Sequence, residues 1–152
     1  MLPATTTRVE RNTDSQINAR IRRRTEASVA YFASHPEEID RRLDELDHEW
    51  DIERTLEANV ATIGFAGVAL GAFVNRGWLL LPAMATAFLF QHALQGWCPP
   101  VPVLRRLGVR TAGEIAAERY ALKALRGDFE SALVPSGDGQ GRARAALQSV
   151  YA

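Results

Sequence analysis

The chain has 152 residues and a mass of 16.8 kDa, which is the size of one domain. Its 18 basic and 18 acidic side chains give a formal net charge of zero, so an overall basic surface for nucleic acid is not indicated. The single cysteine cannot form an internal disulfide, which excludes a secreted disulfide scaffold.

The N-terminal third of the sequence is predicted to lie outside any membrane. Residues 1–14 are predicted to be a disordered lead-in, and they lack the apolar stretch of a cleaved signal peptide. Residues 15–57 are predicted to form a helical arm in the cytoplasm. Its first part, about 15–33, contains four arginines, which would face either solvent or an anionic lipid or acidic protein surface.

The second part of this arm, residues 37–57, has the pattern of an amphipathic helix. It holds ten acidic residues and three arginines, so an anionic bilayer surface should repel it. We therefore expect its apolar stripe to pack on protein, from this chain or a second copy. Ile52 and Leu56 lie off the stripe, which argues against a long coiled coil. The stripe has spacings of 4, 3 and 4 and consists of Ile39, Leu43, Leu46 and Trp50.

Charged residues are almost absent from the middle of the chain. Between residues 58 and 104 only Arg76 is charged, whereas 24% of the whole chain is charged. Two apolar runs, 60–74 and 78–90, flank a turn signal at Asn75-Arg76-Gly77. This pattern predicts a helical hairpin over residues 58–97.

The hairpin has two possible environments. Its uninterrupted runs are shorter than the ~20 residues of a usual membrane span, so a buried hairpin in a soluble helical oligomer is one alternative. Neither run has a polar face, which favours two membrane spans and a lipid bilayer as partner. Trp78 and Trp97 would be roughly 28 Å apart along a helix, close to the ~30 Å hydrocarbon thickness.

Arginines flank the hairpin on its terminal side. Six of them lie near its two ends and only Arg76 lies in the turn, so the positive-inside rule predicts that both termini are cytoplasmic. Three of the arginines, with the two tryptophans, are predicted to be interface anchors at the lipid headgroups. These anchors are Trp78, Trp97, Arg105, Arg106 and Arg110.

Small residues of the first span share one helical face and allow close helix packing. They are Gly64, Gly67 and Gly71. Their partner is expected to be either Ala83 and Ala87 of the second span or the same face of another subunit. Polar residues at the end of the second span are expected to form interhelical hydrogen bonds. These residues are Gln91, His92 and Gln95.

Residues 98–134 are predicted to form a juxtamembrane turn followed by an amphipathic helix. Three prolines at 99, 100 and 102 are expected to stop the helix and to extend the chain. Thr111 and Glu114 form a capping box that begins the next helix. That helix is basic and is expected to pack on the acidic 37–57 helix, within one chain or between subunits. Its packing residues are Ile115, Leu122 and Leu125. Residues 135–152 are predicted to be a flexible tail with a short helix.

Cys98 is the one candidate for chemistry. Its thiol could accept sulfur, be acylated or form an intersubunit disulfide, or it could be a small apolar residue in a turn. No neighbouring His or Lys would lower its pKa. One Cys and three scattered His have no metal-ligand spacing, and no phosphate-binding loop or nucleophile motif is present. We expect no metal, no cofactor and no enzymatic activity.

Parts of the chain resemble a family of small bacterial inner-membrane proteins with a YgaP-like transmembrane hairpin. The resemblance covers about residues 40–127 and rests on 46–54, 91–100 and 105–111, with Gly96-Trp97-Cys98 as its best match. In the inner-membrane rhodanese that carries a similar hairpin, the hairpin anchors and dimerises a sulfurtransferase domain. This chain has no room for that domain and lacks its catalytic cysteine loop, so the resemblance implies an inner-membrane location and a homo-oligomer, with a dimer favoured.

These observations predict an all-α protein, formed by a two-helix transmembrane hairpin with amphipathic cytoplasmic helices on both arms. The favoured function is a structural or scaffolding module with a protein partner on the cytoplasmic side. One alternative is a membrane-anchored thiol protein that uses Cys98 in sulfur relay or redox chemistry with a sulfurtransferase partner. The further alternative is the soluble oligomer.

Overall fold

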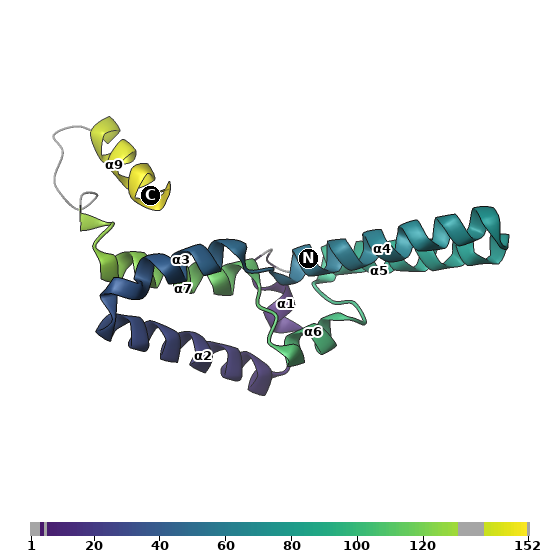
Figure 1. The fold of residues 1–152 in the computed structure, drawn as a ribbon, viewed down its shortest axis with the longest axis horizontal. Coiled ribbons are helices and arrows are strands. Elements are labelled where there is room, and N and C mark those ends of the chain that lie inside the picture. The colour runs from purple at the N-terminus through teal and green to yellow at the C-terminus, as the bar shows by residue number, and fades with distance from the viewer. Residues whose placement is uncertain (1–3, 5, 131–138, 152) are drawn as a thin grey trace. The chain divides into compact units, whose positions relative to one another are not determined.

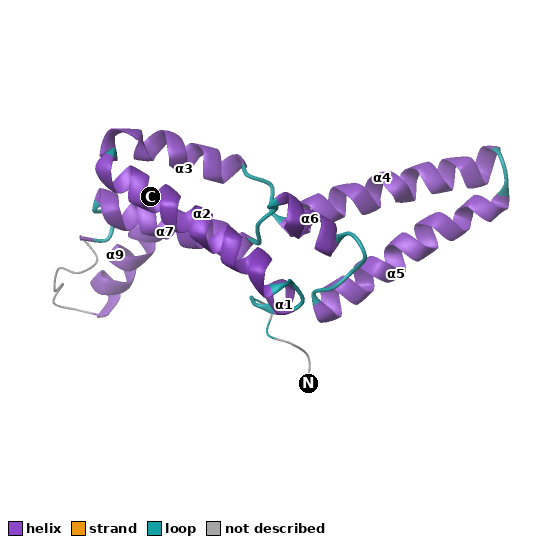
Figure 2. Cartoon of the chain, turned by 90° about the horizontal axis from the view of Figure 1, so that it is seen from below, coloured by secondary structure: helices purple, strands orange, loops and turns teal. Residues whose placement is uncertain are grey.

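The computed structural model describes residues 4, 6–130 and 139–151. In this part of the chain every regular element is a helix and no strand is present, which confirms the all-α prediction (Figures 1 and 2). The elements in chain order are α1 (Arg8–Arg11), α2 (Ser15–Ser34), the 3-10 helix η1 (Pro36–Glu38), α3 (Ile39–His48), α4 (Ile52–Phe73), the 3-10 helix η2 (Arg76–Leu79), α5 (Leu80–Gln95), α6 (Val101–Leu107), α7 (Ala112–Arg126) and α9 (Gly139–Tyr151).

The chain divides into two compact units. The first unit contains residues 1–23 and 50–115, and the second contains residues 24–49 and 116–152. Helices α2 and α7 each begin in the first unit and end in the second. The two units are described separately.

In the first unit, α4 and α5 lie side by side and are joined at one end by η2 (Figures 1 and 2). The turn begins at Asn75, whose side-chain oxygen accepts the backbone N–H of Gly77 at 2.7 Å. At the start of α4, Asp51 is the N-cap and accepts the N–H of Arg54 at 2.7 Å. We call α4 and α5 together the α4–α5 pair, and the end opposite η2 its base.

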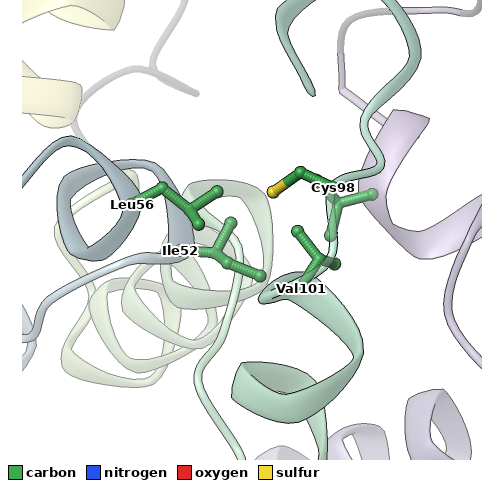
Figure 3. Packing of buried hydrophobic residues seen from close by; sticks show 5 residues of the cluster. Ile52, Leu56, Cys98 and Val101 are labelled. Carbon is green, nitrogen blue, oxygen red and sulfur yellow. The ribbon is translucent and has the colours of Figure 1, made fainter. Parts of the chain in front are cut away.

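A small apolar core lies at the base of the pair. It contains one residue of α1, two of α4 and two from the start of α6 and the turn before it. Figure 3 shows the Cys98 thiol directed toward the side chains of Ile52 and Leu56. The core residues are Val9, Ile52, Leu56, Cys98 and Val101, with Leu104 and Val109 packed against them. Ile52 and Leu56 lie off the stripe of the preceding helix because they belong to a different core.

Three segments differ from the sequence prediction. Residues 8–11, predicted to be disordered, form α1 because Val9 is buried in the core. The prolines at 99, 100 and 102 predict an extended turn, but residues 101–107 form α6, because Pro100 and Pro102 occupy the N-cap and first turn, where a missing N–H costs little. The 37–57 helix is interrupted at Glu49, whose backbone is extended, and begins again after the Asp51 cap.

The second unit contains the end of α2, then η1, α3, the end of α7 and α9. Its apolar interior is formed mainly by the predicted stripe of α3 and one residue each of α2 and α7. These buried residues are Phe32, Ile39, Leu43, Leu46 and Leu122. Within the predicted C-terminal tail, residues 139–151 form α9, while residues 135–138 lie outside the described residues.

Candidate functional site

The surface of the α4–α5 pair is apolar around most of both helices. Several large side chains are more than half exposed, including Phe65 (80%), Phe73 (89%), Leu80 (70%) and Phe90 (66%). A helical pair that faces water normally has a polar stripe on each helix. The exposed apolar side chains of this pair depart from that pattern.

The lengths of these helices permit a membrane span. The helical stretches Pro36–Phe73 and Arg76–Gln95 are both long and apolar enough to cross a membrane. Only 17% and 6% of their most apolar windows are buried. The core helix of a soluble protein would be mostly buried, so these values do not fit that class of helix within the monomer.

Two of the three predicted glycines of α4 pack closely on the following segment, Gly67 on α5 and Gly71 on Leu79 of η2. A Cβ on Gly67 would overlap the ring of Pro82 and lie 3.3 Å from Leu81 Cβ, and a Cβ on Gly71 would lie 2.6 Å from Leu79 Cδ2. Gly64 would meet nothing within 4 Å. Ala83 and Ala87, the predicted partners, are exposed. Gly67 and Gly71 therefore pack on Leu79, Leu81 and Pro82 instead of the predicted Ala83 and Ala87.

The predicted interface anchors occupy different environments. Trp78 and Trp97 lie before and after α5 and are 45% and 36% exposed. Arg106 is exposed as well. Arg105 and Arg110, which were expected at the headgroups, are instead buried, with 1% and 7% exposure. Their burial removes them from any lipid-facing surface.

A cluster of polar side chains, which we call the base cluster, lies at the base of the α4–α5 pair. His92 of α5, only 1% exposed, places Nε2 2.9 Å from Oε2 of Glu53 in α4. Arg8 of α1 donates to the other carboxylate oxygen at 2.7 Å. A carboxylate can only accept, so Nε2 of His92 carries the proton. Its Nδ1 is buried without a hydrogen-bond partner among the described residues. This contact gives His92 the interhelical role that was expected for it.

Gly96 allows the end of α5 to lie close to α1. It ends α5 in the left-handed conformation, with φ 75°, and a Cβ there would lie 2.5 Å from the carbonyl carbon of Arg8. Beside it, Asn12 Nδ2 donates to the carbonyls of Arg8 and Gln95, each at 2.8 Å. The glycine is thus required both by its backbone angle and by the close approach of α1.

Cys98 lies in the core and not at an exposed interface. It is 2% exposed, and burial, with a further contribution from the Glu53 carboxylate, raises the pKa of its thiol. A thiolate nucleophile needs the opposite, a lowered pKa and access to substrate. Its sulfur lines an apolar cleft of about 100 Å³ between α4, α5 and the following turn. The arrangement fits the apolar-residue interpretation of Cys98.

Arg105 is held by a buried polar network. Its guanidinium forms a bidentate pair with Glu114, at 2.6 and 2.7 Å, and also donates to Asn18 Oδ1 at 2.9 Å and to the Val109 carbonyl at 3.1 Å. Glu114 is also the predicted capping-box partner of Thr111, whose N–H it accepts at 2.8 Å. One carboxylate therefore caps α7 and neutralises a buried arginine.

These contacts set the ionisation of Glu114. Burial alone would raise its pKa, but the hydrogen bonds from Arg105 and Thr111 outweigh burial and hold the pKa below its usual range. Glu114 therefore remains charged at neutral pH, as the buried Arg105 requires.

In the second unit the acidic α3 and the basic α7 are joined by ion pairs. Arg119 pairs with Asp47, and Arg126 pairs with Asp40. A third pair is more buried. Glu118, 1% exposed, accepts from Arg42 Nε at 3.0 Å and from Ser28 Oγ at 2.6 Å. The opposite charges seen in the sequence meet within one chain.

The other predicted packing residues divide into two groups. Ile115 and Leu122 are buried, at 5% and 0% exposure, while Leu125 and Trp50 are 46% and 50% exposed. Trp50 lies after the interruption at the end of α3, and the guanidinium of Arg54 lies 4.5 Å from its ring. Sequence periodicity placed Trp50 on the stripe because it assumed one uninterrupted helix.

Within the described ranges, no group of three or more His, Cys, Asp or Glu side chains is placed to hold a metal ion. No family model, curated protein or solved structure matches the chain. The resemblance to YgaP-like hairpins therefore stays a prediction.

Proposed function

We propose that this chain is an integral membrane protein of the bacterial inner membrane. In this proposal the α4–α5 pair spans the bilayer as a hairpin and the remaining helices form a structural interaction module on the cytoplasmic side. The observation that carries it is the apolar surface of the pair. Each large apolar side chain left in water forgoes about 1.5–3 kcal/mol of burial free energy, which lipid tails would supply.

The distribution of charge supports the same arrangement. Along the pair, charged side chains occur only at Arg76, the first residue of η2, and near the base, at Glu53, Arg54 and Glu57 of α4. Polar headgroups lie at these two levels when a hairpin spans a bilayer. The imbalance of arginines between the two ends favours the base on the cytoplasmic side.

A scaffolding role is favoured over a reaction at Cys98. The buried thiol with a raised pKa gives no support to sulfur relay. In this proposal the helices of the second unit, joined by the ion pairs between α3 and α7, contact another protein or a second copy. The resemblance to YgaP-like hairpins adds a preference for a homodimer.

The experiment that tests the proposal combines extraction with labelling. Membranes that contain the chain are washed with alkaline carbonate, which should leave the protein in the pellet. A Cys98→Ser chain with Arg76→Cys is then treated with a membrane-impermeant maleimide on intact cells, and Glu26→Cys in the same background is the control. We expect labelling at position 76 and none at position 26. Release by carbonate, or the reverse labelling pattern, would contradict the span or its orientation.

A further inference from the structure

Helix α1 is too short to be stable by itself. It has four residues, whereas isolated helices below about 12 residues are marginal in water. Its order must come from contacts with the rest of the first unit. The central contact is Val9, which is 3% exposed and packs in the core beside Ile52, Leu56 and Cys98.

Polar contacts join α1 to both helices of the α4–α5 pair. Arg8 donates to Glu53 of α4 at 2.7 Å, and Asn12 donates to the last carbonyl of α5, that of Gln95, at 2.8 Å. Gly96 lies so close to the Arg8 backbone that any side chain there would collide with it. The segment thus crosses the base of the pair from α4 to α5.

We propose that α1 is a releasable strap. When docked, it closes the base of the α4–α5 pair and covers the core around Cys98. When α1 is released, the core is exposed to solvent and the Glu53 carboxylate loses the ion pair with Arg8 but keeps the hydrogen bond with His92. Helices α4 and α5 stay folded. Their packing at Gly67 and Gly71 does not involve α1, so the two parts can separate.

The contacts that hold α1 on the rest of the first unit are few and weak enough for α1 to detach locally. The Arg8–Glu53 ion pair is partly exposed, with side-chain exposures of 19% and 35%, and such pairs contribute little to stability. Only one large apolar side chain, Val9, is buried by α1 itself. Segments with few buried contacts open far more often than the whole protein unfolds. The strap would dock in this way whether lipid or water surrounds the pair.

The test uses Cys98 as a reporter, since it is the single thiol in the chain. The full chain in mild detergent is reacted with a maleimide and the rate is compared with that of the denatured chain. We expect slow reaction in the original chain and a rate roughly tenfold higher in Val9→Ala, which removes two carbon atoms from the core. Arg8→Ala should also react faster. Arg11→Ala, on the exposed side of α1, is the matched control and should react at the original rate.

A second measurement separates release of α1 from unfolding of the unit. Helical circular dichroism and the exchange protection of α4 amides should be unchanged in Val9→Ala, while α1 amides lose protection. The proposal is overturned if Val9→Ala reacts at the original rate, or if Arg11→Ala accelerates labelling equally. Loss of α4 protection together with faster labelling would also overturn it.

Discussion

His92 and Glu53 are 39 positions apart in sequence, yet Nε2 of the histidine donates to Oε2 of the carboxylate at 2.9 Å. This hydrogen bond links α5 to α4 at the base of the pair, one turn before Glu57, the last charged residue of α4. Arg8 balances the carboxylate from the other side. Charge is therefore neutralised where the proposed headgroup region meets the apolar helices.

Removal of Glu53 should destabilise the first unit. In Glu53→Ala, Nε2 of the buried His92 loses its acceptor, and a buried donor without a partner costs about 1–3 kcal/mol. Denaturant unfolding in micelles, followed by circular dichroism, would measure this loss. Glu57→Ala, one turn further along α4 and exposed, is the control and should leave stability nearly unchanged. Equal effects of the two substitutions would contradict the role of the base cluster.

Gly67 and Gly64 of α4 should respond differently to substitution by alanine. Gly67→Ala places a methyl group against the Pro82 ring, which cannot rotate away, so we expect a loss of about 1–3 kcal/mol. Gly64→Ala meets no atom within 4 Å and should stabilise the helix by up to about 1 kcal/mol. Thermal unfolding of both variants in the same detergent measures the difference. A loss at Gly64 as large as that at Gly67 would indicate that Gly64 packs on another subunit.

If the ion pairs between α3 and α7 contribute to stability, exchanging the two charged residues of one pair should restore the stability that a single charge reversal removes. Arg119→Asp faces Asp47 with a like charge and should lower stability by less than about 1 kcal/mol, since both side chains are partly exposed. Combining it with Asp47→Arg restores the pair in reverse and should recover most of the loss. A double-mutant cycle of unfolding free energies checks this. Additive effects of the two changes would show that these side chains do not interact.

The contribution of Glu114 to the stability of the folded chain should depend on pH. Its pKa is lowered in the folded chain, so its stabilising effect is fully present above the usual carboxylate pKa of about 4.3. The effect is lost as the pH falls through the lowered folded-state value. Glu114→Gln should therefore be less stable at pH 6, and the difference in thermal midpoint from the original chain should narrow toward pH 3. Glu26→Gln, an exposed site, should show no such change; a constant difference for Glu114→Gln would contradict the pairing.

Local signals in the sequence were sufficient for much of the fold. The Asn75-Arg76-Gly77 turn, the Thr111–Glu114 capping box and the α3 stripe each depend on residues within a few positions. The opposite charges of α3 and α7 also indicated a contact between segments far apart in the sequence, because the net charge of a segment can be counted without knowing its geometry.

The contacts that the sequence did not predict depend on tertiary geometry. Val9 is a lone apolar residue in a polar segment, so no periodicity indicates its burial. In the sequence, Arg105 has the position of a headgroup anchor. In the fold, the turn before α7 places Glu114 against its guanidinium, and local sequence does not indicate this contact. The prolines after Cys98 end one helix and begin another, and sequence alone does not distinguish these two effects when an apolar helix follows at once.

The central claim is that lipid surrounds the α4–α5 pair. Spin labels at Val68, Leu80 and Met84, introduced one at a time in Cys98→Ser chains reconstituted in vesicles, test it through their collisions with oxygen and with a water-soluble nickel complex. All three sites are exposed, and Tyr120 is an exposed control in the second unit. We predict high oxygen and low nickel accessibility at the three sites, and high nickel accessibility at 120. Nickel access at all four sites, or protection from both reagents along the pair, would contradict a membrane span.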